Sequence, residues 1–304
     1  MRTFTFKGLF LTAVFMLLGC LTIQAADDDL ITKQITIKLD EAGTLPNKIA
    51  SSEMYKITNL KITGEINGTD WKMIREMAGR DYQGYHTKGN LSVLDLSEAK
   101  IVEGGDYYYD DDRGCTSNDK IGYSAFAYCS GLTSLNLPDG ITKISDGAFS
   151  GCSGLTSLNL PDGITEIGES AFSGCSGLTS LNLPAGITSI GSEAFYGCSG
   201  LTSIYVYAEK VPDIGRNAFE GFDAKKCTLY VPMGTYDDYW LSNFGDYFED
   251  IVEFDATGID KTTTSTDVEE VARYSVNGQR LSAPTKGLNI VKYSDGSVKK
   301  VAVR

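Results

Sequence analysis

Residues 144–166 read ISDGAFSGCSGLTSLNLPDGITE, and this unit decides the fold because it recurs almost unchanged every 23 residues. The other full copies start at Ile121, Ile167 and Ile190. A degraded fifth copy starts at Ile214 and places Phe222 where the others have cysteine. A fixed period of this length indicates a repeat architecture, in which each unit is one structural element.

Each unit contains one short strand. Residues 155–160 read LTSLNL, in which alternation places Leu158 and Leu160 on one face. Ser157 and Asn159 then lie on the opposite face. Turn residues follow, and one unit therefore forms one coil of chain. A single coil buries too few apolar side chains to offset its loss of conformational entropy, whereas stacked coils share one continuous core, as in a solenoid.

The Leu-x-x-Leu-x-Leu strand and the Ile-Gly-x-x-Ala-Phe-x-Gly-Cys-x-Gly-Leu return resemble the BspA-type leucine-rich repeat of bacterial surface proteins, over residues 90–254. The resemblance implies a right-handed solenoid displayed at the cell surface, in a family with members that act as adhesins. It implies no ligand. We therefore expect a β-rich α/β chain: a right-handed leucine-rich repeat solenoid with an N-terminal α/β cap and a small C-terminal β-hairpin tail.

Residues 27–89 are predicted to cap the first coil, because the ends of a solenoid need polar covers. Two stretches alternate as strands, residues 34–39 and 59–63. Thr69 and Asp70 are the predicted N-cap of a helix whose Trp71 faces the core. At the other end, the solenoid region is expected to finish at residue 254 with a strand, a helix from about Thr235 and a last strand.

The C-terminal residues differ in composition from the repeats. Residues 255–270 are polar and rich in Thr and Asp, as linkers are, whereas residues 271–304 resume strand patterns around Asn277-Gly278 and Asp295-Gly296. This last segment resembles the C-terminal sorting tails of secreted proteins from the Bacteroidetes, which implies delivery to the outer surface. The alternative is a small β module without a sorting role.

Residues 1–26 have the pattern of a cleaved secretory signal, with basic residues, a short apolar run and small residues before an acidic stretch. Leu17-Leu18-Gly19-Cys20 resembles a bacterial lipobox, so lipidation at Cys20 is an alternative to cleavage near Ala26. The mature chain is expected to be exported to the outer cell surface or secreted. Membrane contact is expected only through a lipid anchor at Cys20.

Composition disfavours several classes of function. The formal net charge of -13 repels nucleic acid, and basic residues do not cluster. The chain has 1 histidine, His86, which leaves little histidine-dependent metal or acid–base chemistry. The recurring Gly-Cys-Ser-Gly does not match the nucleophile elbow, because its second glycine comes one position early. We expect no enzyme, no catalytic residue, no metal and no cofactor.

The repeat cysteines are predicted to be free and buried. In-register side chains on stacked coils lie about 4.8 Å apart and point the same way, whereas a disulfide needs Cβ atoms about 3.8 Å apart that face each other. Cys115 and Cys227 flank the array, several coils apart, and are not expected to pair. The predicted row of thiols is Cys129, Cys152, Cys175 and Cys198.

One insertion interrupts the repeat spacing. Residues 104–112 read GGDYYYDDD and are expected to form a solvated loop on one rim of the solenoid. Their aspartates lack the EF-hand spacing for Ca²⁺. The tyrosines make this loop an alternative contact site, because aromatic side chains give large contact area at low entropic cost.

The predicted binding surface is the outward face of the stacked strands, here called the strand face. Ser and Asn occupy its middle, which lowers the desolvation cost of binding, and tyrosines occupy its C-terminal edge, where hot spots are expected. The alternative is that Ser and Asn only keep the strands soluble. The predicted residues are Val93, Asp95, Ser134, Asn136, Ser157, Asn159, Ser180, Asn182, Ser203, Tyr205 and Tyr207.

Three functions are compared on this basis. The first is a non-catalytic, adhesin-like surface protein whose strand face binds an extracellular protein or glycan. The second is a surface-structural or glycan-capture protein without a specific protein partner. The third is a hydrolase, which the missing catalytic groups disfavour.

Overall fold

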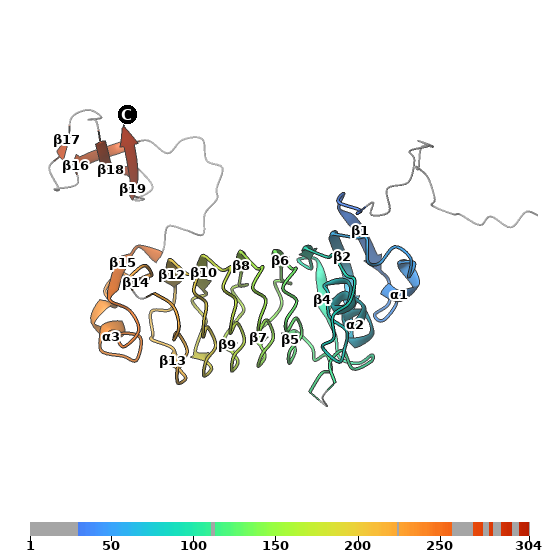
Figure 1. The fold of residues 1–304 in the computed structure, drawn as a ribbon. Coiled ribbons are helices and arrows are strands. Elements are labelled where there is room, and N and C mark those ends of the chain that lie inside the picture. Colours follow the sequence, from blue (N-terminus) through green and yellow to red (C-terminus); the bar gives the residue numbers. More distant parts are fainter. Residues whose placement is uncertain are drawn as a thin grey trace, which may run out of the picture.

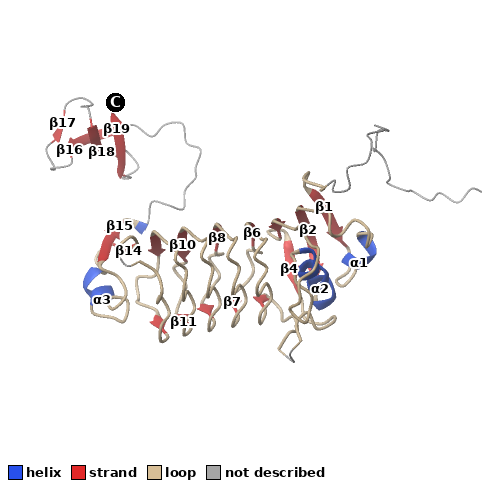
Figure 2. Ribbon diagram, viewed as in Figure 1, coloured by secondary structure: helices blue, strands red, loops and turns tan. Residues whose placement is uncertain are grey.

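The computed structural model describes residues 30–110, 113–223 and 225–256, together with four C-terminal strands. The predicted secretory signal, including Cys20, and nearly all of the predicted linker 255–270 lie outside the described residues. The central part of the chain is a stack of coils in which short strands alternate with turns (Figure 1; Figure 2).

One long parallel sheet runs the length of the stack. Nine of its ten strands follow the order β1-β2-β3-β6-β8-β10-β12-β14-β15, and β4 pairs with β2. The strands are β1 (Ile35–Leu39), β2 (Asn59–Ile66), β3 (Val93–Asp95), β4 (Ala99–Ile101), β6 (Ser134–Asn136), β8 (Ser157–Asn159), β10 (Ser180–Leu183), β12 (Ser203–Val206), β14 (Thr228–Pro232) and β15 (Asp250–Phe254). The sheet therefore continues across residue 89, where the sequence predicted the border of the cap.

A second parallel sheet lies along the opposite edge of the coils (Figure 1). Its five strands are β5 (Lys120–Ile121), β7 (Lys143–Ile144), β9 (Glu166–Ile167), β11 (Ser189–Ile190) and β13 (Asp213–Ile214). Each contributes one isoleucine, in register with the next, to the interior. Threonine side chains join the coils as well, because Thr165 Oγ1 donates to Thr142 O at 3.3 Å and Thr188 Oγ1 to Thr165 O at 2.9 Å.

Stacked phenylalanine rings form the centre of the core. The five rings are fully or almost fully buried, and neighbouring ring planes differ by between 1° and 10°. Centroid separations run from 5.1 Å to 5.4 Å, within the range of favourable aromatic pairs. The column consists of Phe126, Phe149, Phe172, Phe195 and Phe219. Because these residues recur in the repeat, every coil of the repeat contributes one ring to the core.

The repeat cysteines occupy a second buried column and are free, as predicted. Cys152 Sγ donates to Phe126 O at 3.0 Å, and Cys175 Sγ donates to Phe149 O at 3.1 Å. Each of these thiols therefore bonds to the backbone of the coil before it. Burial raises the pKa of Cys198 to about 12, so these thiols stay protonated at neutral pH.

Backbone hydrogen bonds between the turns have a direction. Phe126 N donates to Ala148 O, and Phe149 N donates to Ala171 O, both at 2.7 Å. The carbonyls of each coil thus accept from the coil before it. The first coil has no such predecessor, and its buried carbonyls need other donors.

Side chains of the N-terminal residues supply those donors. Ala125 O accepts from Trp71 Nε1 at 3.1 Å and from Arg75 Nη1 at 3.0 Å. Tyr123 O accepts from Tyr108 Oη at 3.1 Å. Trp71 is also buried against the first ring of the phenylalanine column. The first coil is therefore closed by both packing and hydrogen bonding.

The N-terminal helices differ in one detail from the prediction. Helix α1 spans Leu45–Lys48, and helix α2 spans Gly68–Met77. The N-cap of α2 is Asn67 rather than Thr69 or Asp70. Asn67 Oδ1 accepts from Thr69 N, and buried Asp70 accepts from the N–H groups of Gly43, Leu45 and Asn67. Asp70 therefore ties α2 to the segment before it, which sequence spacing alone does not reveal.

Aromatic residues close the C-terminal end of the stack. Helix α3 (Tyr236–Trp240) carries buried Tyr239, whose hydroxyl donates to Ala208 O at 2.7 Å. Phe244 and Phe248 pack on Phe219 at centroid distances of 5.6 Å and 5.3 Å. The predicted helix and the two strands around it are confirmed.

The C-terminal strands form a separate antiparallel sheet in the order β17-β16-β18-β19. They are β16 (Glu270–Ser275), β17 (Arg280–Leu281), β18 (Gly287–Tyr293) and β19 (Val298–Val303). The two predicted turns fall between paired strands, and their residues lie outside the described ones. The tail is thus a four-stranded sheet, larger than the small hairpin expected.

Replacing Phe172 with Ala should lower the free energy of unfolding by about 3–5 kcal/mol, because the change leaves a cavity between two stacked rings. Chemical denaturation measures this loss. The exposed control Ser180→Ala should change the value by less than about 0.5 kcal/mol. An unchanged midpoint for Phe172→Ala would contradict the core assignment.

A thiol reagent should label Cys115 in the native protein, because that side chain is exposed. The four repeat cysteines and Cys227 are buried and should react only after unfolding. Burial also raises the pKa of Cys129 to about 11, so mildly alkaline reagent should not change this result. Mass spectrometry of the non-reduced protein provides the check, and disulfides among the repeat cysteines would refute it.

Candidate functional site: the strand face

The strand register brings the predicted residues, apart from Tyr207, into two outward columns. In the longer column, Asp95 pairs with Asn136, Asn136 with Asn159, and Asn159 with Asn182. Asn182 then pairs with Tyr205. In the other column Val93, Ser134 and Ser157 are in register, as are Ser180 and Ser203. The predicted alignment is confirmed.

The exposure of these side chains varies along the face. Exposed residues occupy the middle: Asn136, Ser157, Asn159, Ser180 and Asn182. Partly buried residues occupy the two ends: Val93, Asp95, Ser134, Ser203, Tyr205 and Tyr207. The leucines and Ile204 that alternate with them are buried, so the strands have one inner and one outer face.

Four aromatic side chains gather at the C-terminal end of the face, and we call them the aromatic corner: Tyr205, Tyr207, Tyr230 and Phe254. Tyr205 stacks on Tyr230 with 4.3 Å between ring centroids and 7° between planes. Phe254 meets Tyr205 edge-on at 5.7 Å and Tyr207 edge-on at 5.2 Å. Burial raises the pKa of Tyr205, and the adjacent Tyr230 contributes to the shift. The Tyr205 hydroxyl therefore stays protonated at neutral pH.

Tyr230 and Phe254 were missing from the predicted surface. Tyr230 lies in the same outward column as Tyr205, because β14 continues the register of β12. The alternation of residues 228–231 already contained this signal. Phe254 could not be found in this way, since it reaches Tyr205 and Tyr207 from β15, two strands further on.

Charged residues lie at the N-terminal end of the face. Lys61 Nζ lies 2.6 Å from Glu98 Oε1 and 3.4 Å from Asp95 Oδ2. Burial opposes ionisation of Asp95, but hydrogen bonds from Ser97 and Lys61 lower its pKa overall. Asp95 is therefore already paired, so the charge that the sequence placed on the face is neutralised locally.

The loop at residues 104–112 is only partly solvated. Tyr107 is 58% exposed, as expected, but Tyr108 is fully buried beside Trp71, at a centroid distance of 6.2 Å. The expectation of a solvated loop is therefore wrong at Tyr108, which closes the first coil. Asp111 and Asp112 lie outside the described residues.

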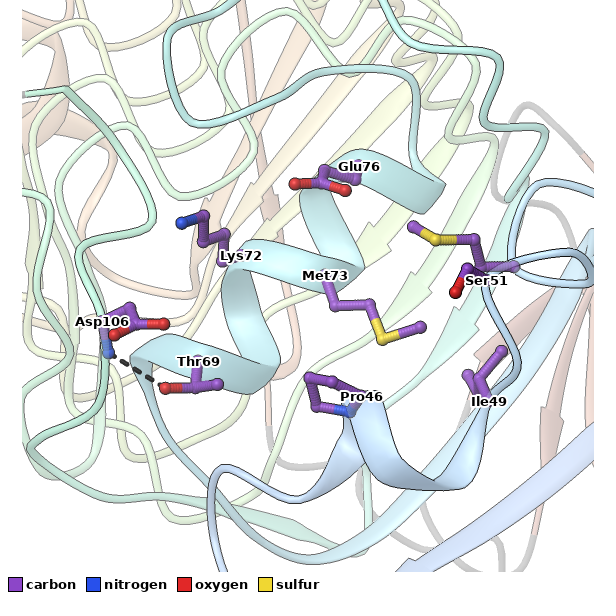
Figure 3. Close-up of a pocket in the computed structure, with 9 residues that line it drawn as sticks. Pro46, Ile49, Ser51, Thr69, Lys72, Met73, Glu76 and Asp106 are labelled. Carbon is purple, nitrogen blue, oxygen red and sulfur yellow. Dashed lines mark hydrogen bonds between the residues drawn. The ribbon is translucent and has the colours of Figure 1, made fainter.

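A pocket of about 240 Å³ lies between α1 and α2, away from the strand face (Figure 3). Met73, Met54 and Ile49 line its apolar part, and Lys72 and Glu76 lie on its rim. Burial raises the pKa of Glu76, and the nearby Lys72 opposes the shift. None of the predicted binding residues lines this pocket.

The described residues offer little for catalysis. His86 is exposed, whereas the repeat thiols are buried. Among the described residues, no group of three or more His, Cys, Asp or Glu side chains is placed to hold a metal ion. None of the helices in the described ranges has the length and apolarity needed to cross a membrane.

The repeat itself identifies its family. Residues 119–244 match a family model described as a BspA type leucine rich repeat region, in 6 copies. Residues 119–244 of the solenoid are therefore BspA-type leucine-rich repeats. The match extends past the last phenylalanine of the column into α3. No curated protein sequence matches the chain.

Three solved structures are similar to this chain. A leucine-rich repeat protein of T. pallidum is 17% identical, over 74% of this chain and 73% of that one, with a TM-score of 0.32. A leucine-rich cell surface protein of Faecalibacterium prausnitzii is 17% identical, over 78% and 48%, with a TM-score of 0.32. A leucine-rich repeat protein of Bacteroides ovatus is 22% identical, over 73% and 66%, again with a TM-score of 0.32.

Changing Tyr108 to Phe should lower the free energy of unfolding by about 1 kcal/mol, because Tyr123 O loses its hydrogen-bond donor while the ring still fills the same space. Thermal and chemical denaturation measure the loss. The control Tyr107→Phe, at the exposed neighbour, should behave as wild type. Equal stability of the two variants would show that Tyr108 acts through packing alone.

Proposed function

We propose that this chain is a non-catalytic, adhesin-like binding protein of the outer cell surface, and that its strand face binds an extracellular macromolecule. The aromatic corner carries the proposal. Tyr205 and Tyr230 are partly buried rings held in place by mutual stacking. Preordered tyrosines give large contact area at little entropic cost, and such residues dominate interface energetics.

The middle of the strand face supports the same proposal. Asn136, Asn159 and Asn182 form an exposed, uncharged column beside the aromatic corner. Amide groups donate and accept hydrogen bonds without the desolvation cost of full charges. This surface suits a ligand with backbone amides or hydroxyls, as extracellular proteins and glycans have.

Export is proposed from the sequence. The signal pattern of residues 1–26 favours secretion, with lipidation at Cys20 as the alternative, and residues 271–304 resemble a surface-sorting tail. A BspA-type repeat region fits this destination, because proteins of this family are generally binding or adhesin-like. Fractionation of cells with and without residues 271–304 tests the route: loss of surface protein on truncation supports the sorting role, and unchanged display contradicts it.

The ligand class can be found by a binding screen. The purified protein is presented to immobilised extracellular matrix proteins and, in parallel, to polysaccharides. Saturable binding to a matrix protein supports an adhesin-like role, and saturable binding to a polysaccharide supports a glycan-capture role. Failure to bind any member would favour a surface-structural protein without a specific partner.

With a ligand in hand, Tyr205→Ala should weaken binding at least tenfold, which corresponds to about 1.4 kcal/mol. Tyr207→Ala should also weaken it, whereas Asn159→Ala in the middle of the face should have a smaller effect. Because Tyr205 stacks on Tyr230, its removal should also lower stability by about 1 kcal/mol.

Two measurements separate these effects. Surface plasmon resonance gives the affinity of each variant, and thermal denaturation shows that each remains folded at the temperature used. Wild-type affinity for both tyrosine variants would place the ligand site elsewhere on the protein.

A further inference from the structure

A second candidate site lies on the edge that carries the short strands β5, β7 and β9, apart from the strand face (Figure 1). It is a groove of about 320 Å³, which we call the tyrosine groove. Its lining comes from the loop before β5 and from the turns of three consecutive coils. The aromatic and charged residues of this lining are Tyr109, Arg113, Tyr123, Tyr128, Asp146 and Glu169.

Tyr128 has a backbone conformation that disfavours its residue type. Its φ is 61°, in the left-handed region, where the backbone of residues other than glycine is strained. The next four coils have glycine at the same position, with φ between 68° and 86°: Gly151, Gly174, Gly197 and Gly221. Only the first coil places a tyrosine there, and the residue is 53% exposed. Strain retained at an exposed aromatic residue is typical of a functional position.

The neighbours of Tyr128 hold its ring over the groove. A methyl group at Gly151 would lie 2.6 Å from Tyr128 Cδ1, so the ring covers the glycine of the next coil. Arg80 Nε donates to Tyr128 O at 3.0 Å, and its guanidinium lies 5.7 Å from the ring centroid. Glycine at position 151 is therefore required for the ring to take this place.

Two more tyrosines form the adjoining wall. The rings of Tyr109 and Tyr123 meet edge-on at 5.8 Å. The guanidinium of Arg113 lies 3.7 Å from the centroid of Tyr123, and its Nη2 donates to that hydroxyl at 2.8 Å. These contacts fix the orientation of the Tyr123 ring at the groove.

Carboxylates and hydroxyls complete the lining. Asp146 in the second coil and Glu169 in the third are at the repeat position that Tyr123 has in the first coil. Both carboxylate side chains are exposed. Asp146 Oδ1 accepts from Glu169 N at 2.9 Å, so its side chain is oriented along the edge. Ser150 and Ser170 add hydroxyl groups between them. The groove thus presents aromatic rings beside donors and acceptors of both kinds.

We propose that the tyrosine groove binds a neutral oligosaccharide. The apolar C–H faces of sugar rings pack on tyrosine rings, and sugar hydroxyls both donate to carboxylates and accept from hydroxyl and guanidinium groups. Asp146 and Glu169 repel anionic sugars, while Arg113 in the lining and Arg80, whose guanidinium lies beside the Tyr128 ring, disfavour a basic peptide. A neutral chain of sugars satisfies all these groups at once.

Isothermal titration calorimetry of the purified protein against four neutral hexaoses, from cellulose, chitin, amylose and mannan, tests the proposal. An oligolysine peptide and a sulfated hexaose serve as charged rivals. At least one neutral hexaose should bind, and Tyr128→Gly should weaken it at least tenfold. The control Tyr196→Ser removes another exposed tyrosine, at a position where two coils already have serine, and should bind as wild type.

Tyr128→Gly installs the residue of the other coils, so its melting temperature should equal or exceed that of wild type. A lower melting temperature would contradict the strain on which the proposal rests. Binding of no neutral hexaose, wild-type affinity in Tyr128→Gly, or binding of a charged rival alone would overturn the proposal. Loss of sugar binding in Tyr205→Ala, with wild-type affinity retained in Tyr128→Gly, would place the sugar on the strand face and overturn the proposal for the tyrosine groove.

Discussion

Each coil of the solenoid depends on its neighbour, because its turn donates backbone hydrogen bonds to the next coil and its phenylalanine ring stacks on the next ring. The strands at the other edge obey the same register. Packing and hydrogen bonding therefore require the same 23-residue spacing, and each reinforces the other. The thiol column adds a third set of contacts, since the cysteine of one coil donates to the phenylalanine carbonyl of the coil before it. A core residue at a repeat position is thus selected by the coils on both sides.

In the middle of the solenoid, each coil packs on and hydrogen-bonds to its neighbours. The first and last coils lack one neighbour, so other residues must cover their rings and pair with their backbone groups. At the first coil Trp71 and Arg75 donate to Ala125 O, and Arg75 does so while fully buried. The ring of Tyr109 lies 5.1 Å from its guanidinium and offsets part of the desolvation cost. At the last coil, Phe244 and Phe248 cover the ring of Phe219, and the Tyr239 hydroxyl donates to Ala208 O. The ends are therefore chemically unlike, although the coils between them are nearly identical.

The features that the sequence predicted correctly are those that repeat with the 23-residue period. The phenylalanine and cysteine columns and the outward Ser and Asn columns all follow from one repeat and from strand alternation. Sequence reasoning failed where contacts join residues that no period relates. Tyr108 reads as part of a polar loop but fills the end of the core, and Phe254 joins Tyr205 from another strand. The N-cap of α2 was placed too late, although Asn67 and Asp70 form a local capping box. The bonds that Asp70 accepts from Gly43 and Leu45 are tertiary and have no such sequence signal. The handedness of the solenoid and the domain borders stay predictions.

The near identity of the middle coils also bears on how such a chain changes over generations. Gene duplication or loss of one unit replaces an interface with an equivalent one, since both neighbours present the same ring, thiol and strand. Each added unit would move the aromatic corner about 4.8 Å further from Tyr128, the spacing of adjacent strands. The number of repeat units therefore sets the distance between the two ends of the solenoid, in steps of one strand spacing. It does not alter the residues at either end.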